Sequence, residues 1–368
     1  MTPAEDGEVF AVITGGGTGG HVYPALALAD ELVARGHARD AIRFVGARRG
    51  LEARVVPEAG YAIDLLPGRR FRRRLAAANV GAAWDTLRAL VQARRILAHA
   101  RPEVVVGVGG YASLPSLVAA RVQRVPTVVH EQNAAPGLAN RIAVRMGARA
   151  AVSLPGTPLR GAVLTGNPVR SEVTAVRREP DPLHPLVTVF GGSLGAGTIN
   201  DAVLGLYERW RDRADPTVHH VTGSRNYEAC SARLSAIRRP SDRLHYELVD
   251  YEDHMEHLYA RTSIAVCRAG AITVAELAAA GVPAVLVPLP GAPGDHQTRN
   301  AEALVDGGAA IVVPDAECDA ARLDAELSGL LADAARLEAM ATAAGTLGRP
   351  DAAADLAELV EEAARARR

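Results

Sequence analysis

The chain has 368 residues, 48% of them hydrophobic, and a formal net charge of −1; its 41 basic residues other than histidine are all arginine. This length exceeds one typical core and fits two domains. The near-neutral charge excludes a general polyanion-binding protein. Three scattered cysteines, an acidic N-terminus without a signal-peptide pattern and the lack of a long apolar run lead us to expect an intracellular protein that is not integral to a membrane.

The first half of the chain alternates apolar runs with helical patterns. Strands are expected at 9–13, 42–46, 103–108 and 126–130, and helices at about 21–35, 84–100 and 114–123. Such alternation is typical of a doubly wound parallel sheet, so the predicted fold class is α/β.

A glycine-rich turn, Gly15-Gly16-Gly17-Thr18-Gly19-Gly20-His21, follows the first expected strand and opens a helix. Backbone N–H groups and the positive end of a helix meet at such a turn, which suits phosphate. A dinucleotide site would also need an acid just after the second strand, but that strand ends in Ala47-Arg48, so NAD binding is disfavoured. The helix dipole would keep His21 neutral and able to accept a proton, although the residue could also merely cap or pack the helix.

Two further polar segments of the first half follow strands, namely Gly107 to Ser113 and His130-Glu131-Gln132-Asn133. The first half then ends near Gly166-Asn167-Pro168-Val169-Arg170, and the charged stretch 177–182 is typical of a linker. We therefore predict an N-terminal domain at 1–168, a second domain at 169–346 and a C-terminal helix at 347–368 that packs back on the first domain.

The second half repeats the strand–glycine–helix arrangement twice. Gly191-Gly192-Ser193-Leu194-Gly195-Ala196 follows the strand at 186–190, and Arg268-Ala269-Gly270-Ala271 follows the strand at 263–267. The N–H groups of residues 271–273 could hold a diphosphate, with the Thr273 hydroxyl adding a donor. Glu276, about one turn further on, is within reach of a ribose diol, or is simply a favourable acid near a helix start. Two nucleotide-type domains facing a common cleft are the predicted architecture.

A Pro/Gly-rich loop at 288–294 follows the strand at 284–287, where open α/β sheets place ligands. The polar cluster after it (Asp295, His296, Gln297 and Asn300) suits sugar hydroxyls, or is a polar helix cap. No Asp-x-Asp pair lies near these loops, so the sequence requires no cofactor and does not indicate a divalent cation. Helix ends could stabilise a departing diphosphate instead.

Seven of these segments, in order from about residue 9 to about 315, resemble the MurG-type glycosyltransferases of peptidoglycan synthesis. The segments that carry the resemblance are Gly15 to His21, Gly109-Gly110-Tyr111, His130 to Asn133, Gly166 to Arg170, Gly191-Gly192-Ser193, Gly270 to Glu276 and Asp295 to Asn300. The resemblance implies the GT-B architecture of two Rossmann-like domains around a cleft. It also implies inverting transfer of GlcNAc from UDP-GlcNAc to the C4 hydroxyl of MurNAc-pentapeptide-diphospho-undecaprenol (lipid I), giving lipid II.

The resemblance assigns the donor to the C-terminal domain. Glu276 would bind the ribose, and the backbone near Tyr251 and Glu252 would contact the uracil. The diphosphate would be bound by Ser193, Ala271, Ile272 and Thr273, with Arg170 close to the donor. The GlcNAc hydroxyls would be bound by His296, Gln297, Asn300 and Asn133. The acceptor diphosphate would lie on Gly16, Gly17, Thr18, Gly19, Gly20, Gly109, Gly110 and Tyr111. Inversion needs a base for the acceptor hydroxyl. His21 is the candidate, and Glu131 is the less favoured alternative.

Two positions depart from the family pattern. Leu194 stands where members often carry glutamine after the serine, so a contact to the donor phosphate or the acceptor could be missing or replaced. The loop at 290–294 is also slightly longer and richer in Gly and Pro than expected, which affects the sugar-site register by one residue.

An arginine-rich run, Arg69-Arg70-Phe71-Arg72-Arg73-Arg74-Leu75, follows the second strand. It is either a solvated basic loop or a surface that docks on an anionic leaflet, where each charge contributes about 1 kcal/mol. A lipid-linked acceptor favours docking, so we expect a peripheral protein on the cytoplasmic face of the cell membrane, with other cell-wall synthesis proteins as further candidate partners. Nucleic acid is not an expected partner, because the charge is near neutral and no known motif is present.

Three other functions are compatible with the same sequence. One is a UDP-sugar GT-B transferase that acts on another lipid or on a natural product. A second is a UDP-GlcNAc 2-epimerase, which needs no lipid acceptor. The third is a catalytically silent sugar-nucleotide binding protein, against which the intact glycine turn beside His21 argues.

Overall fold

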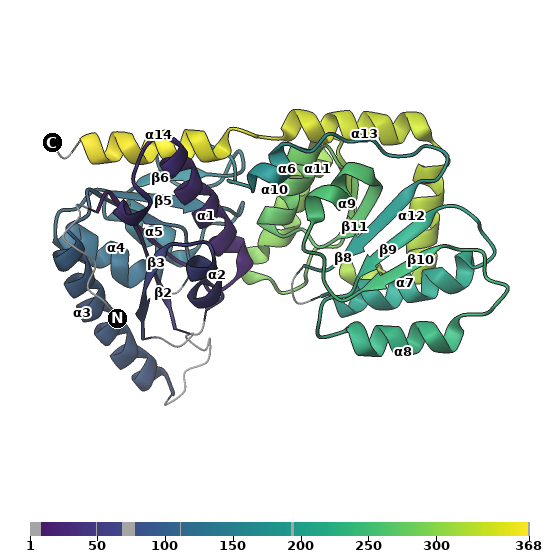
Figure 1. Cartoon of the computed structure of the whole chain (residues 1–368), viewed down its shortest axis with the longest axis horizontal. Helices are drawn as coiled ribbons and strands as arrows, with labels where there is room; N and C mark the ends of the chain where they lie inside the picture. Colours follow the sequence, from purple (N-terminus) through teal and green to yellow (C-terminus); the bar gives the residue numbers. More distant parts are fainter. Residues whose placement is uncertain (1–8, 49, 68–77, 111, 193–194, 367–368) are drawn as a thin grey trace. The chain divides into compact units, whose positions relative to one another are not determined.

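The computed structural model describes residues 9–48, 50–67, 78–110, 112–192 and 195–366. The chain forms two compact units (Figure 1): unit 1 comprises residues 1–170 and 350–368, and unit 2 comprises residues 171–349. The sequence placed these boundaries after residues 168 and 346. The segment 177–182 lies within unit 2, where the Arg178 guanidinium donates hydrogen bonds to the carbonyls of Gly281 and Thr262. It is therefore packed against unit 2, and the expectation of a linker at that segment was wrong.

Unit 1 is built on a seven-stranded sheet with the order β3-β2-β1-β4-β5-β6-β7, in which every pair of neighbours is parallel. Its strands are β1 (Ala11–Thr14), β2 (Ile42–Ala47), β3 (Ala62–Leu66), β4 (Val104–Gly107), β5 (Thr127–Glu131), β6 (Arg149–Val152) and β7 (Val163–Leu164). Its helices are α1 (Gly19–Ala34), η1 (Arg39–Ala41), α2 (Glu52–Glu58), α3 (Ala78–Ala100), α4 (Ser113–Val122), α5 (Leu138–Arg145) and α14 (Ala352–Arg365).

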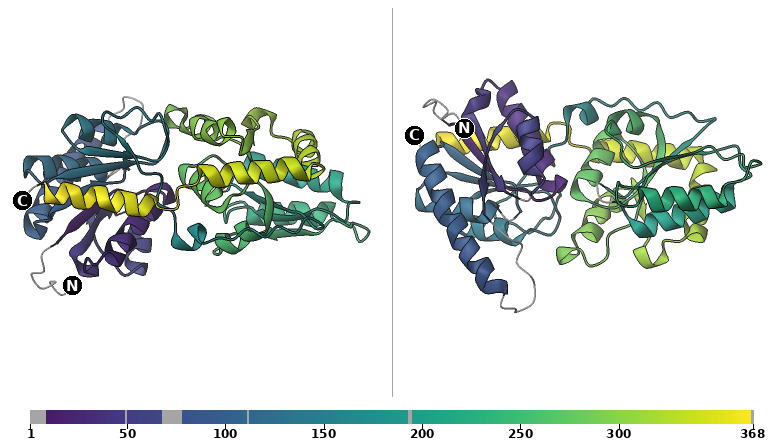
Figure 2. Two further views of the ribbon diagram at one scale, coloured as in Figure 1. Left: turned by 90° about the horizontal axis from the view of Figure 1, so that it is seen from above. Right: turned by 60° about the horizontal axis from the view of Figure 1, so that its bottom comes forward.

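Two apolar layers cover the two faces of this sheet. One joins strand residues to α1 and α14, and the other joins them to α3, α4 and α5. Helix α14 follows unit 2 in the sequence but belongs to unit 1, where it lies beside α1 (Figure 2). It buries Leu356 and Val360 completely, and its outer face pairs Glu361 with Arg35 and Glu362 with Arg149. The apolar stripe of this helix therefore completes the core of unit 1.

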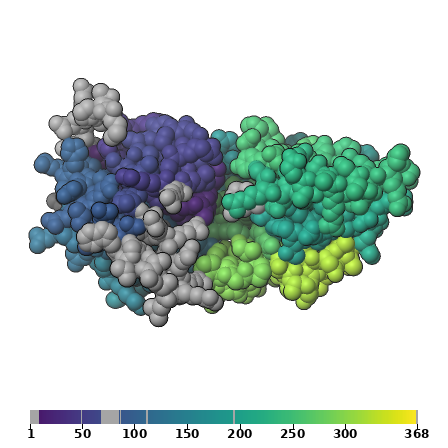
Figure 3. All heavy atoms as spheres, turned by 90° about the horizontal axis from the view of Figure 1, so that it is seen from below, coloured from purple at the N-terminus to yellow at the C-terminus, as the bar shows by residue number. Residues whose placement is uncertain are grey.

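Unit 2 has a six-stranded parallel sheet with the order β10-β9-β8-β11-β12-β13. Its strands are β8 (Leu186–Phe190), β9 (Thr217–Val221), β10 (Tyr246–Val249), β11 (Thr262–Cys267), β12 (Ala284–Leu286) and β13 (Ala310–Val312). Its helices are α6 (Ser171–Thr174), α7 (Gly197–Trp210), α8 (Tyr227–Ile237), α9 (Met255–Arg261), α10 (Ala271–Ala280), η2 (Pro293–Asp295), α11 (His296–Asp306), η3 (Asp315–Glu317), α12 (Ala320–Leu331) and α13 (Ala334–Leu347). Helix α8 lies on the outside of this unit, toward the viewer of Figure 3.

In both sheets the strand order reverses at an inner pair of parallel strands, β1 and β4 in unit 1 and β8 and β11 in unit 2. In open α/β sheets, the loops at the carboxyl ends of such a pair are where ligands bind. The four glycine-containing loops that the sequence singled out follow these four strands. The topology therefore places each pair of loops at one edge of its own sheet.

Candidate functional site

Two glycine loops of unit 1 interlock at the carboxyl ends of β1 and β4. The Gly16 N–H donates a hydrogen bond to the Gly109 carbonyl at 3.2 Å. Gly110 has φ +85°, and a Cβ added there would lie 2.2 Å from the Gly16 carbonyl oxygen. Glycine is therefore required at 110 both by the backbone conformation and by the close approach of the two chains. Tyr111, predicted with them, lies outside the described residues.

A buried carboxylate that the sequence did not single out holds the first glycine loop. Glu52, only 2% exposed, accepts hydrogen bonds from the Gly17 N–H at 2.7 Å and from the Ala47 N–H at 2.8 Å. The Gly17 N–H is thus already bonded to an anion. Among the described residues, no acceptor meets the N–H groups of Thr18, Gly19 and Gly20 at the start of α1. These three groups form the part of the loop that can receive a phosphate.

His21 lies in the first turn of α1, half-buried against the second loop. A Cβ on Gly109 would lie 3.0 Å from His21 Cε1, so the imidazole packs directly on that glycine. His21 Nδ1 is 3.0 Å from Gln132 Oε1. Burial lowers the pKa of His21, and this effect outweighs the opposing contributions of the Gln132 hydrogen bond, the Glu131 charge, the Val108 backbone and the Glu52 charge. The ring is therefore neutral at pH 7 and can accept a proton.

Glu131, the alternative base, has its carboxylate occupied by the loop after β5. One oxygen accepts from the Asn133 backbone N–H at 3.1 Å and from the Asn133 amide at 3.4 Å. The other accepts from the Gly137 N–H at 2.8 Å and from the Asn140 amide at 2.9 Å. The residue is 3% exposed. These four donors match the acceptor capacity of a carboxylate, so Glu131 anchors the loop that carries Asn133.

Arg170, predicted near the donor, is the last residue of unit 1 before the chain enters unit 2. Its guanidinium carbon lies 6.0 Å from the centre of the Tyr23 ring, at the outer limit of a cation–π contact. Tyr23 belongs to α1, so the structure places Arg170 on the same side of unit 1 as the start of that helix.

In unit 2, the loop after β11 opens α10 with Gly270 as its N-cap. Ala271, Ile272 and Thr273 form the first turn, where a helix offers no acceptors of its own for backbone N–H groups. Glu276 lies one turn further on, 8% exposed, and its carboxylate accepts a hydrogen bond from the Tyr259 hydroxyl at 3.0 Å. The predicted diphosphate and ribose groups thus share one helix start.

An arginine that the sequence assigned no role ties this loop to the next strand. The Arg268 Nη1 donates to the carbonyls of Val287 and Pro288, at 3.1 and 3.2 Å, and pairs with Asp315 at 2.6 Å. Arg268 is 9% exposed. Because one guanidinium group binds the end of β12 and the start of η3, the start of α10 and the loop after β12 are held together.

The three side chains predicted to read sugar hydroxyls have different environments. His296 donates from Nδ1 to the Pro293 carbonyl at 2.9 Å, and Gln297 accepts from the Leu289 N–H at 2.9 Å; both are half-buried. Asn300 has no exposed surface, and its amide donates to the Ala269 carbonyl at 3.2 Å. Asn300 therefore fixes the loop before α10, whereas His296 and Gln297 keep surface for a ligand.

The loop after β8 is described only in part, because Ser193 and Leu194 lie outside the described residues. Gly195, which follows them, is tightly placed. A Cβ on Gly195 would lie 2.1 Å from the Thr222 carbonyl oxygen, and Gly195 has φ +73°. The loop thus approaches the end of β9 at a distance that only glycine allows.

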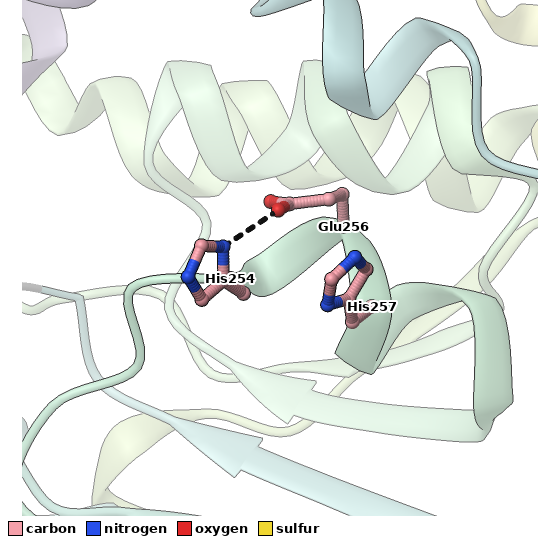
Figure 4. A group of neighbouring side chains, drawn as sticks. All are labelled: His254, Glu256 and His257. Carbon is pink, nitrogen blue, oxygen red and sulfur yellow. Dashed lines mark hydrogen bonds and ion pairs between the residues drawn. The ribbon is translucent and has the colours of Figure 1, made fainter.

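The segment predicted to meet a uracil ring follows β10 and leads into α9. Glu252 accepts from the His254 N–H at 2.9 Å, and the His254 ring contacts Glu256 at 3.0 Å (Figure 4). The rings of His254 and His257 are stacked with their centres 5.4 Å apart. The ligand atoms of His254, Glu256 and His257 all lie within 4.8 Å of one another. The contacts present are those of a helix start.

The arginine-rich run Arg69 to Leu75 lies outside the described residues. In the part of the chain that the structure does describe, none of the helices combines the length and the apolar character needed to span a bilayer.

Two Rossmann-like parallel-sheet units in one chain, each with glycine loops where its strand order reverses, have the architecture of GT-B glycosyltransferases. The family models agree with this class. Residues 11–152 match the N-terminal domain of glycosyltransferase family 28, and residues 186–356 match the C-terminal domain of the same family.

Curated relatives narrow the class further. An enzyme of Alkalilimnicola ehrlichii is 43% identical over 96% of this chain and 99% of its own length, and one of Halothermothrix orenii is 38% identical over the same shares. Both are named UDP-N-acetylglucosamine--N-acetylmuramyl-(pentapeptide) pyrophosphoryl-undecaprenol N-acetylglucosamine transferase. The chain belongs to this family, the MurG glycosyltransferases.

Solved structures give the same result. The crystal structure of Acinetobacter baumannii MurG matches with a TM-score of 0.77 and 29% identity, over 96% of this chain and 99% of that one. The UDP-GlcNAc 2-epimerase from Neisseria meningitidis matches with a TM-score of 0.65 over 96% of this chain and all of its own, but at 13% identity, which shows a shared fold alone. The predicted family and fold are therefore confirmed.

Proposed function

We propose that this protein transfers GlcNAc from UDP-GlcNAc to the C4 hydroxyl of MurNAc-pentapeptide-diphospho-undecaprenol, with inversion at the sugar. The observation that carries the proposal is identity of 38–43% over 96% of the chain to curated enzymes named for this reaction. The natural-product transferases and epimerases that share the fold are 13–20% identical among the solved structures, so they support the architecture and not their own activities.

The donor binds unit 2 in this proposal. The first turn of α10, Ala271 to Thr273, holds the diphosphate with Ser193, and Glu276 accepts hydrogen bonds from the ribose hydroxyls. His296 and Gln297 contact the GlcNAc hydroxyls. The support is geometric, because Arg268 and the buried Asn300 hold the start of α10 beside the loop that precedes α11. Departing UDP gains negative charge, which the positive end of α10 stabilises.

The acceptor diphosphate binds unit 1, at the start of α1. Glu52 occupies the Gly17 N–H, so the binding groups are the N–H groups of Thr18, Gly19 and Gly20. The second loop, Gly109 to Tyr111, supports the first through the Gly16–Gly109 hydrogen bond. This assignment moves the centre of the acceptor site from the glycine run itself to the helix that follows it.

His21 is the base in this proposal. Its imidazole is neutral because burial lowers its pKa, and it lies one residue beyond the N–H groups assigned to the acceptor diphosphate. The lone pairs of Glu131 are taken by four donors of its own loop. Base catalysis of this kind contributes about 10²–10⁴-fold to a rate.

The protein docks peripherally on the cytoplasmic face of the cell membrane through Arg69 to Arg74, with Phe71 and Leu75 entering the headgroup region. The sequence supports this surface with five arginines and two apolar residues in seven positions. Anionic lipids attract such a run, and the proposed acceptor is itself lipid-linked.

The decisive experiment measures UDP release from UDP-GlcNAc by the purified protein, with and without a short-chain lipid I analogue. Release that requires the analogue, together with a GlcNAc-extended product, is the expected result. Release without the analogue would point to an epimerase or a hydrolase and would overturn the proposal. Tight UDP binding without release under either condition would also overturn it, in favour of a silent sugar-nucleotide binding protein.

A further inference from the structure

Gln132 connects two buried histidines, and the sequence assigned it no role. Its amide is 1% exposed and lies between His130, which has no exposed surface, and His21. The amide nitrogen is 3.0 Å from His130 Nδ1 and 3.0 Å from the Val108 carbonyl oxygen. The amide oxygen is 3.0 Å from His21 Nδ1. Every polar atom of this side chain therefore has a partner.

The donor and the acceptor of each hydrogen bond in this network can be assigned by starting from His130. His130 Nε2 is 2.9 Å from the Gly166 carbonyl oxygen, which can only accept, so Nε2 carries the hydrogen. Burial lowers the pKa of His130 to about 4, so the ring is neutral and its Nδ1 is an acceptor. The Gln132 amide nitrogen donates to this Nδ1 and to the Val108 carbonyl. A reversed amide would set its oxygen against that carbonyl, so the orientation is determined.

The oxygen of the Gln132 amide then determines which tautomer His21 adopts. The Gln132 oxygen can only accept, so His21 Nδ1 carries the hydrogen. In a neutral ring the lone pair is then on Nε2. An imidazole without this partner has both tautomers available, and in one of them Nε2 carries the hydrogen and cannot act as a base.

We infer that Gln132 is a positioning residue that holds His21 in the tautomer with its hydrogen on Nδ1, leaving the Nε2 lone pair to accept the proton of the acceptor hydroxyl. This inference deepens the proposed function and rests on it for the identity of the acceptor. As the acceptor oxygen bonds to the anomeric carbon, the bond from that carbon to the diphosphate breaks and UDP leaves with the electron pair. The hydroxyl proton goes to His21 Nε2, and the Gln132 oxygen stabilises the imidazolium through Nδ1–H.

The first test reads the tautomer directly, by ¹⁵N chemical shifts of the His21 ring in histidine-labelled full-length protein at neutral pH. The wild type should show a protonated Nδ1 and an unprotonated Nε2. A wild-type ring with its hydrogen on Nε2 would overturn the inference. This measurement needs no turnover, so it stands even if the proposed transfer reaction fails, and the two failures are distinguishable.

Two variants separate positioning from mere packing. Gln132→Leu should mix the tautomers and lower kcat by about 10²-fold, with the UDP Kd and the acceptor KM changed less than about threefold. The matched control is Ser153→Ala, because the Ser153 hydroxyl contacts the same His130 Nε2 at 3.2 Å from the far side. This control should retain the wild-type tautomer and kcat. A Gln132→Leu protein with an unchanged ring state and unchanged kcat would refute the inference.

Gln132→Glu keeps an oxygen opposite His21, while its second oxygen replaces the amide nitrogen beside the Val108 carbonyl and His130 Nδ1. Folding of both variants is checked by circular dichroism, and the ¹⁵N measurement on the wild type tests the inference if neither variant folds. The added carboxylate should retain the Nδ1–H tautomer and restore part of the lost kcat. It should also raise the pKa of His21 above its wild-type value, adding to the charges of Glu131 and Glu52, which already face the ring. The acid limb of the kcat profile should then move to higher pH, and an unmoved limb would contradict the inference.

Discussion

Replacing Gly110 by alanine tests whether the two glycine loops of unit 1 depend on each other. The new Cβ would lie 2.2 Å from the Gly16 carbonyl oxygen and 3.0 Å from the Gly16 nitrogen. Cβ atoms essentially never lie closer than 3.0 Å to another heavy atom outside their own chain segment. The two loops must therefore separate by about 0.8 Å, the difference between 3.0 and 2.2 Å. That shift would displace the start of α1, where we place the acceptor diphosphate.

Gly110→Ala should lower the free energy of unfolding for two reasons. Alanine at φ +85° loses about 1–2 kcal/mol because its Cβ disfavours the left-handed region. The forced separation adds about 1–3 kcal/mol, as in other overpacked sites. Gly36, just after α1, provides a matched control because its φ is +102° and no atom lies within 4 Å of an added Cβ. Gly36→Ala should therefore lose only the stability that the positive φ costs, about 1–2 kcal/mol.

The two variants are compared by urea unfolding, with hydrogen exchange used to assign the change to one unit, and by steady-state kinetics with a short-chain lipid I analogue. Gly110→Ala should lose about 1–3 kcal/mol more stability than Gly36→Ala, and its acceptor KM should rise while its UDP Kd stays constant. Equal stability losses and equal acceptor kinetics in the two variants would refute the interlocked arrangement. A weakened UDP Kd would also contradict it, because Gly110 belongs to unit 1.

Three further predictions follow from the same structure. Glu276→Gln should weaken UDP-GlcNAc binding about 10–100-fold in calorimetry, since hydrogen bonds to a charged group contribute about 1.5–3 kcal/mol, and an equal rise in acceptor KM would contradict its role. Burial lowers the pKa of His130 to about 4 and that of His220 to about 3, below the unfolded value of about 6.5. The unfolded chain therefore binds more protons, and each of these two histidines should lower the stability of its unit by up to about 1.4 kcal/mol per pH unit as the pH falls from about 6.5 to about 4; urea midpoints that do not change over this range would exclude this. Changing the arginines at 69, 70 and 72–74 to glutamate should abolish sedimentation with anionic vesicles but spare activity on a soluble acceptor, and unchanged sedimentation would rule out the docking surface.

The central strands of both sheets were predictable from the sequence, and the edge strands were not. Strands β1, β4, β8 and β11 are short apolar runs with every residue buried, so composition alone reveals them. The edge strand β3 is largely exposed or half-buried, and β7 has two residues. A strand that buries only part of itself has no strong periodic signal. Strand β9 is an inner, mostly buried strand that the sequence also missed, because its two adjacent histidines weaken its apolar pattern.

The backbone part of the candidate site was predictable, whereas the side chains that support it were not. Strand–glycine–helix order is enough to place the N–H groups near residues 18–20 and 271–273 at the ends of the inner strands. Each supporting side chain contacts a residue far away in the sequence. Glu52 bonds to Gly17, 35 positions away, and Arg268 to Asp315, 47 positions away. Gln132 contacts His21, 111 positions away. Nothing in local sequence shows which polar side chain turns inward, so these contacts required the three-dimensional structure.

The contrast between Glu52 and Arg268 bears on how the two proposed diphosphate sites differ. In unit 1 a buried carboxylate lies under the glycine loop, which disfavours tight binding of a second anion at Gly17. The acceptor diphosphate is the same in lipid I and in lipid II, so binding it more strongly would stabilise substrate and product equally and would not speed the reaction. In unit 2 the half-buried carboxylate of Asp315 is neutralised by Arg268. There the diphosphate of the donor becomes the leaving group, and positive potential at the start of α10 acts on charge that develops only in the transition state. The chemistry of the two loops thus matches the different tasks that the proposed reaction gives to two otherwise similar units.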